Sequence, residues 1–353
     1  MLAGMHIAAG PRLAAAVANA GGFGVIGGLG YTPDDLRQQI KELKGYLNDK
    51  DTPFGVDLLL PQIGGNARKT NHDYTKGRLD ELTDIIIESG AKLFVSAVGV
   101  PPKAIVDKLH KHGLLYMNMI GHPKHVQKCI DLGVDMLCAQ GSEGGGHTGD
   151  IPTGVLIPTI AAMCRGKKSP SGQDVQVIAA GGLFNGQGVA SALMLGANAV
   201  WIGTRFVLSD ESCASKEHQE AIRTAGFDDN VRTIIFTVRK SGKRGYNLLD
   251  STLTLWQGRP LRVRNNSYIQ DWEENRQAEI KQLCDSGKIP VDYELENLGD
   301  KVPEDVKKHA TPLLMGKACG AINERKPAKD IVDEMVNDAV AWLQQGNSYL
   351  LKN

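Results

Sequence analysis

Short apolar runs alternate with longer amphipathic segments along roughly the first 230 residues of the chain. The apolar runs are typical of buried strands, and we expect strands at 23–26, 54–58, 93–98, 114–119, 136–139, 176–179 and 199–202. Between them, apolar side chains recur at helical spacing, as at Leu36, Ile40, Leu43 and Leu47, and the predicted helices include 76–89, 155–165 and 186–195. This alternation indicates parallel βα units.

Glycine marks the change from helix to strand at Gly90, Gly113, Gly133 and Gly196, and an apolar run begins soon after each. A glycine at a helix end followed by a short loop is typical of αβ connections. An eighth strand within residues 1–8 would make a (β/α)8 TIM barrel, and an open doubly wound sheet is the alternative. In such a barrel the active site lies at the carboxyl ends of the strands, and phosphate often binds after the seventh and eighth strands.

The pattern changes after about residue 230. We expect a strand at 233–238, a polar stretch with Arg259, Arg262 and Arg264, and helices at 272–284, 303–310, 314–322 and 328–345. Helices without intervening strands do not continue a barrel. The prediction is a barrel over residues 1–228, a smaller, mostly helical domain over 229–325 at the barrel mouth, and a C-terminal segment, 326–353, whose helix could return to the barrel.

Charge and cysteine content narrow the classes of function. Lysine and arginine together number 40, as do aspartate and glutamate, so the formal net charge is zero. Binding to nucleic acid or to an anionic membrane by long-range attraction is therefore not expected. The six cysteines contain no CxxC pair, which argues against a disulfide framework or a structural zinc site and favours a reducing, cytoplasmic compartment. No apolar run is long enough to span a bilayer.

A glycine-rich stretch follows the strand predicted at 136–139. Residues 140–150 read QGSEGGGHTGD, with three consecutive glycines directly before His147. Glycine is costly wherever order is required, so such a run suggests a backbone that approaches another group closely. Histidine titrates near neutrality and can act as an acid, a base or an anion partner, and Glu143 or Asp150 could orient it. The alternative is a flexible surface loop with one exposed histidine.

Two further glycine sites fall where a barrel binds phosphate. Gly181 and Gly182 end the strand at 176–179, and Gly203 with Thr204 ends the strand at 199–202. Glycine-rich strand ends leave backbone N–H groups open to an anion, and a following helix adds partial positive charge. Ordinary turn formation is the alternative. No metal site is expected, because His122 and His125 have no third ligand nearby.

Two other motifs carry less weight. The glycines from Gly22 to Gly27 fit GxGxxG, but a helix precedes them and the strand lies inside the match, which does not fit a dinucleotide site. Ser142 lies in QGSEG, which misses the GxSxG nucleophile motif by one residue. We therefore expect neither a Rossmann domain nor a hydrolase.

Three segments together resemble the nitronate monooxygenases, FMN flavoproteins once called 2-nitropropane dioxygenases: AQGSEGGGHTGDIPT, VIAAGGLFNGQGVASALMLGANAVWIGTRF and AAAVANAGGFGVIGG. The resemblance runs from about residue 1 to at least 345. It implies FMN at the mouth of the barrel and detoxifying oxidation of alkyl nitronates, such as propionate 3-nitronate, by O2 to a carbonyl compound and nitrite. A homodimer is compatible with it. FMN-dependent enoyl-acyl-carrier-protein reductases carry a similar loop, so enoyl-thioester reduction with NAD(P)H is an alternative, as is a non-catalytic flavin-binding protein.

The resemblance also implies roles for single residues. His147 matches the catalytic histidine, and the residues matching flavin or phosphate contacts are Gln140, Gly145, Gly181, Gly182, Trp201, Ile202, Gly203 and Thr204. Asp57 falls where many relatives have an asparagine beside the flavin, and a carboxylate cannot donate a hydrogen bond unless it is protonated. Relatives begin with a strand ending in Ala-Pro-Met, whereas this sequence starts inside or just after that strand. We therefore expect a truncated first strand and open barrel edges, which would weaken stability and flavin retention.

Overall fold

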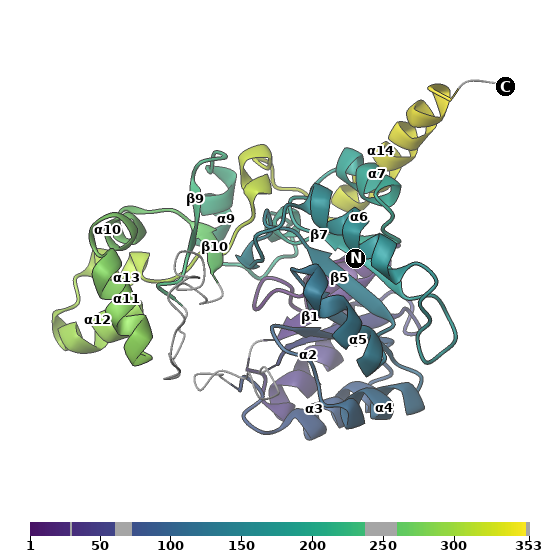
Figure 1. Cartoon of the computed structure of the whole chain (residues 1–353), viewed down its shortest axis with the longest axis horizontal. Coiled ribbons are helices and arrows are strands. Elements are labelled where there is room, and N and C mark those ends of the chain that lie inside the picture. Colours follow the sequence, from purple (N-terminus) through teal and green to yellow (C-terminus); the bar gives the residue numbers. More distant parts are fainter. Residues whose placement is uncertain (29, 61–72, 237–259, 351–353) are drawn as a thin grey trace, which may run out of the picture.

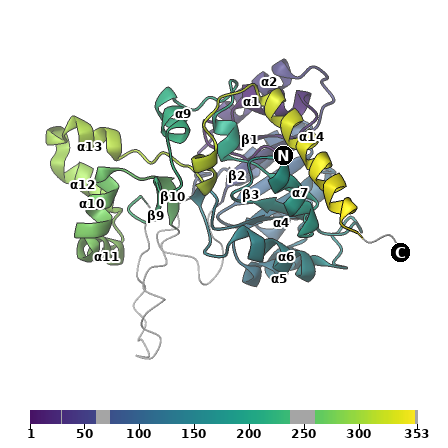
Figure 2. The ribbon, with the colours of Figure 1, turned by 90° about the horizontal axis from the view of Figure 1, so that it is seen from above.

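The computed structural model of the protein describes residues 1–28, 30–60, 73–236 and 260–350. Its centre is a parallel sheet in the order β1-β2-β3-β4-β5-β7-β8, with helices packed around it (Figures 1 and 2). The strands are β1 (Gly24–Gly28), β2 (Phe54–Leu59), β3 (Leu93–Ala97), β4 (Leu115–Ile120), β5 (Met136–Gln140), β7 (Gln176–Ala180) and β8 (Ala199–Trp201). All the apolar runs predicted in the first part of the chain thus join one sheet.

Residues 1–3 lie between the two ends of this sheet. The N–H of Leu2 donates to the carbonyl of Phe23 beside β1, and the N–H of Ala3 donates to the carbonyl of Ile202 beside β8, both at 2.9 Å. The N–H of Ile202 donates in turn to the carbonyl of Met1 at 3.0 Å. The first strand is only a few residues long, but it contacts both neighbours and completes the α/β barrel. The expectation of open edges is therefore wrong.

Helices cover the outside of the barrel: α1 (Pro11–Asn19), α2 (Pro33–Tyr46), α3 (Leu79–Glu88), α4 (Lys103–Lys111), α5 (Val126–Leu132), α6 (Thr153–Cys164), α7 (Gly186–Met194), and the shorter α8 (Thr204–Val207) and η1 (Pro123–His125). Local sequence sets several of their ends. Thr32 and Asp35 form a capping box at the start of α2. Gly133 ends α5 with a φ of 97°, a left-handed conformation that glycine adopts readily. These positions agree with the predicted helix boundaries.

Two apolar layers hold the barrel together. Alternate side chains of the strands point inward, where they bury Ala3, Val25, Leu93, Val95, Met117, Cys138, Ile178, Ala180 and Trp201. The other side chains meet the helices in a larger outer core, which includes Leu13, Ile86 and Leu156. The interior is therefore packed, and chemistry is expected only at the mouth.

A second sheet, in the order β6-β10-β9, joins the barrel to the C-terminal part of the chain. Its strands are β6 (Gly146–His147), β9 (Asn230–Thr233) and β10 (Leu261–Arg264), and both pairings are antiparallel. The predicted strand at 233–238 is wrong, because β9 ends at Thr233 and the chain then turns so that Ile235 packs into an apolar core. Residues 237 and 238 lie outside the described part of the chain.

The remaining described helices are α9 (Lys216–Arg223), α10 (Ser267–Asn275), α11 (Gln277–Ser286), α12 (Pro290–Leu298), α13 (Glu304–His309), α14 (Ala328–Ser348) and the 3-10 turns η2 (Gly299–Lys301) and η3 (Lys317–Ala321). Helices α10–α13 lie to one side of the barrel, beyond the small sheet (Figures 1 and 2), around a core that includes Trp272 and Ile280. The helix predicted at 272–284 breaks at Arg276, whose guanidinium stacks on the Trp272 ring at 3.4 Å. The helix predicted at 314–322 is only the turn η3.

Helix α14 returns to the barrel and runs beside α7 (Figure 2). Its buried residues Ala328, Ile331 and Met335 belong to the outer core of the barrel. Among the described residues, no helix is long and apolar enough to cross a membrane.

Candidate active site

The glycine-rich stretch begins at the carboxyl end of β5, at the barrel mouth, and is part of the small sheet. Gly146 and His147 form β6, where Gly146 pairs with Arg262 and His147 with Leu261 of β10. The half-buried histidine therefore lies on a strand that a distant segment holds in place, which contradicts the interpretation as a flexible surface loop.

The glycines of this stretch are needed for close packing. A Cβ on Gly145 would lie 2.8 Å from the backbone N of Gly316, and a Cβ on Gly144 would lie 2.4 Å from Nε2 of Gln140. Gln140 Nε2 also donates to the carbonyl of Gly145 at 3.3 Å. The loop thus folds back on Gln140 and against residues 315–316, so packing within the chain already requires these glycines.

The two carboxylates predicted to orient His147 bind other residues in the described part of the chain. The carboxylate of Glu143 accepts hydrogen bonds from the N–H and the hydroxyl of Thr153, at 3.0 and 2.8 Å, at the start of α6. The carboxylate of Asp150 pairs with Arg232 of β9. Both acids fix the loop at points beside the histidine, because they connect it to α6 and to the small sheet.

Arg262 holds the same loop from β10. Its side chain is buried, with Nη2 2.9 Å from the carbonyl oxygen of Ser142 and Nη1 2.8 Å from Oδ1 of Asn230. Burial lowers the pKa of Arg262, and the nearby Arg232 lowers it further. The guanidinium nevertheless stays charged at neutral pH, because arginine does not lose its proton in proteins. A charged donor therefore binds the backbone of the histidine loop.

The predicted phosphate site lies at the ends of the adjacent strands β7 and β8. Gly181 and Gly182 have φ angles of 98° and 72°, which favour glycine. The backbone N–H groups of Gly182 and Gly203 donate no hydrogen bond within the part of the chain that the structure describes. Two strand ends with open N–H groups form a cradle suited to an anion.

The residues around this cradle are tied to the histidine loop. The Thr204 hydroxyl accepts a hydrogen bond from the N–H of Gly316 at 2.9 Å. The Thr153 hydroxyl, which shares its one proton between Glu143 and this acceptor, lies 2.9 Å from the carbonyl oxygen of Gly181. A Cβ on Gly181 would lie 2.9 Å from the carbonyl oxygen of Gly141. The structure thus brings Gln140, Gly145, His147, Gly181, Gly182 and Thr204 into one connected region.

Trp201 and Ile202 support this region from below. The Trp201 side chain is buried in the barrel interior, and Ile202 packs in the outer core. Both backbone groups of Ile202 bind residues 1 and 3. Packing and closure of the barrel thus explain why Trp201 and Ile202 are where they are. The N–H and the side chain of Ile202 already have partners within the protein, so neither is left to contact a cofactor.

Asp57 lies on β2, beside Gly27 of β1 and Val95 of β3. Its side chain is 2% exposed, and Oδ1 has no hydrogen-bond partner within the described residues. Burial raises the pKa of Asp57 to about 8. The carboxyl is therefore mainly protonated at neutral pH and can donate a hydrogen bond, unlike a carboxylate.

Backbone strain also concentrates at the barrel mouth. Ile7, in the loop after residues 1–3, has a φ of 63°, and Val98, directly after β3, has a φ of 70°. Positive φ is a genuine outlier for β-branched residues. Such strain often occurs at functional sites, where the surrounding structure holds the chain in place.

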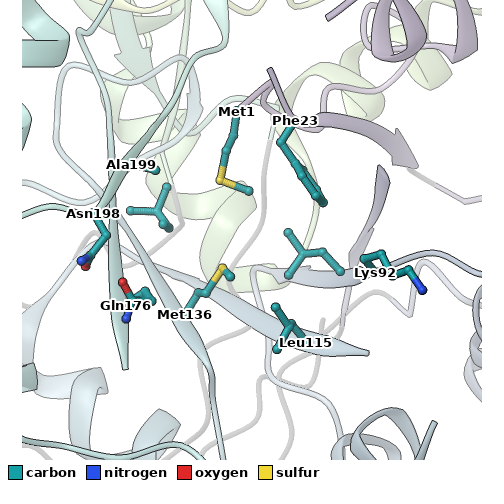
Figure 3. Close-up of a pocket in the computed structure, with 10 residues that line it drawn as sticks. Met1, Phe23, Lys92, Leu115, Met136, Gln176, Asn198 and Ala199 are labelled. Carbon is teal, nitrogen blue, oxygen red and sulfur yellow. The ribbon is translucent and has the colours of Figure 1, made fainter. Parts of the chain in front are cut away.

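A cavity of about 280 Å³ lies at the opposite end of the barrel. It is lined at the amino ends of the strands by Met1, Leu115, Met136 and other mostly apolar side chains, which surround it in Figure 3. Lys92 carries the one charged side chain among the described residues that line it. This end of a barrel serves stability, so we place the chemistry at the mouth.

The donor set at the mouth fits a phosphorylated cofactor such as FMN. The open N–H groups of Gly182 and Gly203 suit a phosphate, and the orphaned polar atom of Asp57 suits a polar ring. No group of three histidine, cysteine or acidic side chains that could hold a metal occurs among the described residues.

Sequence reasoning missed three residues that hold the site: Thr153, Arg262 and Gly316. Arg262 lies in the segment interpreted as polar, although 261–264 reads Leu-Arg-Val-Arg, the alternation typical of a half-buried strand. No local signal marks Thr153 or Gly316, because their partners lie far away in the chain.

Comparison with known proteins identifies the family. The sequence model described as nitronate monooxygenase matches residues 1–338. A probable nitronate monooxygenase of Staphylococcus saprophyticus is 31% identical over 261 residues, which cover 67% of this chain and 72% of that protein. A Mycobacterium tuberculosis protein named (3aS,4S,5R,7aS)-5-hydroxy-7a-methyl-1-oxo-octahydro-1H-indene-4-carboxyl-CoA dehydrogenase is 27% identical, with 98% and 94% covered.

The fold has counterparts among solved structures. FabK from Thermotoga maritima superposes with a TM-score of 0.70 at 26% identity, covering 99% of this chain and 95% of that one. The agreement of family match, fold and loop geometry leads to one conclusion: this chain is an enzyme of the nitronate monooxygenase family, whose members are flavin-dependent oxidoreductases.

Proposed function

We propose that this enzyme binds FMN at the ends of β7 and β8 and oxidises small alkyl nitronates, such as propionate 3-nitronate, with O2 to a carbonyl compound and nitrite. The position of His147 carries the proposal: the small sheet holds it on the loop that packs against Gly181 and Gly182. A fixed histidine beside an open anion cradle suits a cofactor phosphate and a small anionic substrate.

Different residues at the barrel mouth bind different parts of the cofactor. Backbone N–H groups of Gly182 and Gly203 hold the phosphate, and Gln140 and Gly145 line the loop side of the cofactor. Bound FMN supplies the redox chemistry, and the protein supplies orientation and electrostatics. The buried layer that includes Trp201 excludes water from below.

His147 would hold and orient the nitronate. With a neutral nitroalkane it would accept the α-proton, because an imidazole titrates near neutral pH. The antiparallel pairing with β10 fixes its backbone, so little ordering is needed when substrate arrives.

The test is the variant His147→Asn, which keeps a polar side chain but cannot accept a proton. We expect it to retain FMN and to lose about 10²–10⁴-fold in turnover of the neutral nitroalkane, whose α-proton it can no longer accept. Bound FMN and nitroalkane oxidation are measured on the same preparation. Unchanged turnover would contradict the role of His147.

The second candidate is NAD(P)H-dependent reduction of an enoyl thioester. The likeness to FabK at 26% identity over nearly the whole chain favours it. Anaerobic mixing separates the two, because rapid bleaching of the flavin by NADH or NADPH favours the reductase, and bleaching by nitronate alone favours the oxidation proposed above.

A further inference from the structure

Asp57 is a buried acid that takes no part in the proposed oxidation itself. Its Oδ1 has no hydrogen-bond partner within the described residues, and no other described side chain forms an ion pair with it. Buried polar atoms are nearly always paired in folded proteins, and an unpaired one in a stable fold calls for an unseen partner or a functional reason. The missing partner is therefore a clue to what occupies the barrel mouth.

The carboxyl lies near the mouth end of the barrel. Asp57 is in register with Gly27 and Val95, in the second half of β2. A Cβ on Gly4 would lie 2.4 Å from Oδ2 of Asp57, so the carboxyl packs directly against the loop that follows residues 1–3. Cys138 of β5 is close enough to interact electrostatically with it, and Gln140 follows two residues later at the loop. Asp57 thus lies just under the region assigned to the cofactor.

We propose that Asp57 is a protonated carboxylic acid that donates a hydrogen bond to the bound flavin, so that ionisation of this acid weakens flavin binding. The inference rests on the proposed binding of FMN. It gives Asp57 the donor role of an amide, with one difference: an acid loses its donor when it ionises, and an amide does not.

Among the described residues, the titratable groups that interact electrostatically with Asp57 are Tyr31 and Cys138. Burial raises the pKa of Asp57 to about 8. Burial also raises the pKa of Tyr31 and of Cys138, so both stay neutral between pH 7 and 9.5, and the Tyr31 hydroxyl already donates to the carbonyl of Gly27. Burial lowers the pKa of the Met1 ammonium to about 6, below this range.

The experiment uses the full chain, stripped of flavin and titrated with FMN at pH values from 7 to 9.5. Flavin fluorescence reports the dissociation constant for the wild type, Asp57→Asn and Asp57→Leu. The asparagine variant keeps a donor that cannot ionise, and the leucine variant has no donor at any pH. Circular dichroism checks that each variant is folded, and either folded variant suffices for the comparison.

We expect the wild-type dissociation constant to rise about tenfold over this range, the effect of losing roughly one hydrogen bond. Asp57→Asn should match the wild-type value at pH 7 and stay constant after correction for the flavin's own titration. Asp57→Leu should be weaker and also constant. Equal pH profiles for wild type and Asp57→Asn, or tighter wild-type binding at high pH, would overturn this role alone. Failure of the wild type to bind FMN at any pH would overturn the proposed cofactor as well.

Discussion

The acids near the mouth differ because their surroundings differ. Glu143 has two donors from Thr153 and Asp150 has Arg232, whereas Oδ1 of Asp57 has no hydrogen-bond partner and its carboxyl forms no ion pair among the described residues. Desolvation is therefore uncompensated only at Asp57, and it favours the neutral form there. From the sequence, the position of Asp57 could be matched to an asparagine, but its protonation could not be predicted, because it depends on burial by distant segments.

Asp57 should also make the flavin-free protein sensitive to pH. Its native pKa is raised above the ordinary value of 3.8, so the folded state keeps a proton that the unfolded chain releases. This contribution is present below about pH 4 and is lost as pH rises towards about 8, by at most about 1.4 kcal/mol per pH unit. The variant Asp57→Asn cannot ionise. Its free energy of unfolding should therefore increase relative to that of the wild type as pH rises across this window, and the difference should stay constant at higher pH. Urea denaturation at pH 5 and pH 8 measures the difference in stability between the two proteins. An equal difference at both pH values would refute the raised pKa of Asp57.

Gly182 offers a test of the phosphate cradle. Gly182→Ala places a side chain at a φ of 72°, 3.0 Å from the Cβ of Glu143, so we expect a loss of about 1–3 kcal/mol in stability and weaker FMN binding. Gly172 is the matched control, because its φ is 80° and a Cβ there meets open space. Gly172→Ala should be destabilised by backbone strain alone and bind FMN as the wild type does. Equal FMN affinity in all three proteins would count against the cradle.

At the scale of elements, the small sheet is what places His147. The barrel strands were predictable because each is a continuous apolar run, whereas β6 has two residues and β10 carries charged side chains on alternate positions. The predicted strand at 233–238 failed because its apolar side chains fill the core around Trp272 after β9 has ended. The histidine loop could thus be located from the sequence, but the strand that holds it, β10, could not be predicted.

Arg262 makes the role of this sheet testable. Removing its guanidinium in Arg262→Met frees the carbonyl of Ser142 and Oδ1 of Asn230, and we expect a loss of about 1–3 kcal/mol in stability together with lower nitronate turnover. Arg264→Met is the control on the same strand, because Arg264 binds Asp229 and the carbonyl of Ala221 instead of the loop. Thermal unfolding and nitronate turnover are measured for both variants and compared. Turnover lowered equally in both would mean that β10 acts only through general stability.

At the scale of the whole molecule, contacts between distant parts of the chain complete the barrel. Residues 1–3 connect β8 to β1, and α14 packs along α7 and contacts α1. The barrel itself follows from the regular βα pattern, whereas ring closure could not be predicted, because it depends on backbone hydrogen bonds to residues 23 and 202 that carry no side-chain signal.

The packing of α14 predicts a contrast between two adjacent residues. Met335 is 7% exposed and belongs to the outer core of the barrel, whereas Val336 is 55% exposed. Met335→Ala should destabilise the protein by about 2–5 kcal/mol, and Val336→Ala by less than about 0.5 kcal/mol. Guanidinium denaturation compares the two. Similar small effects would mean that α14 is not part of the barrel core.

The most direct test of the central claim is an anaerobic visible spectrum of the purified protein before and after adding ethylnitronate, with NADH or NADPH added to a parallel sample. We predict a flavin spectrum that nitronate bleaches and that neither NADH nor NADPH bleaches rapidly, with the colour returning and nitrite appearing when O2 is admitted. A protein without flavin, or a flavin that a reduced nicotinamide bleaches and nitronate leaves oxidised, would contradict the account.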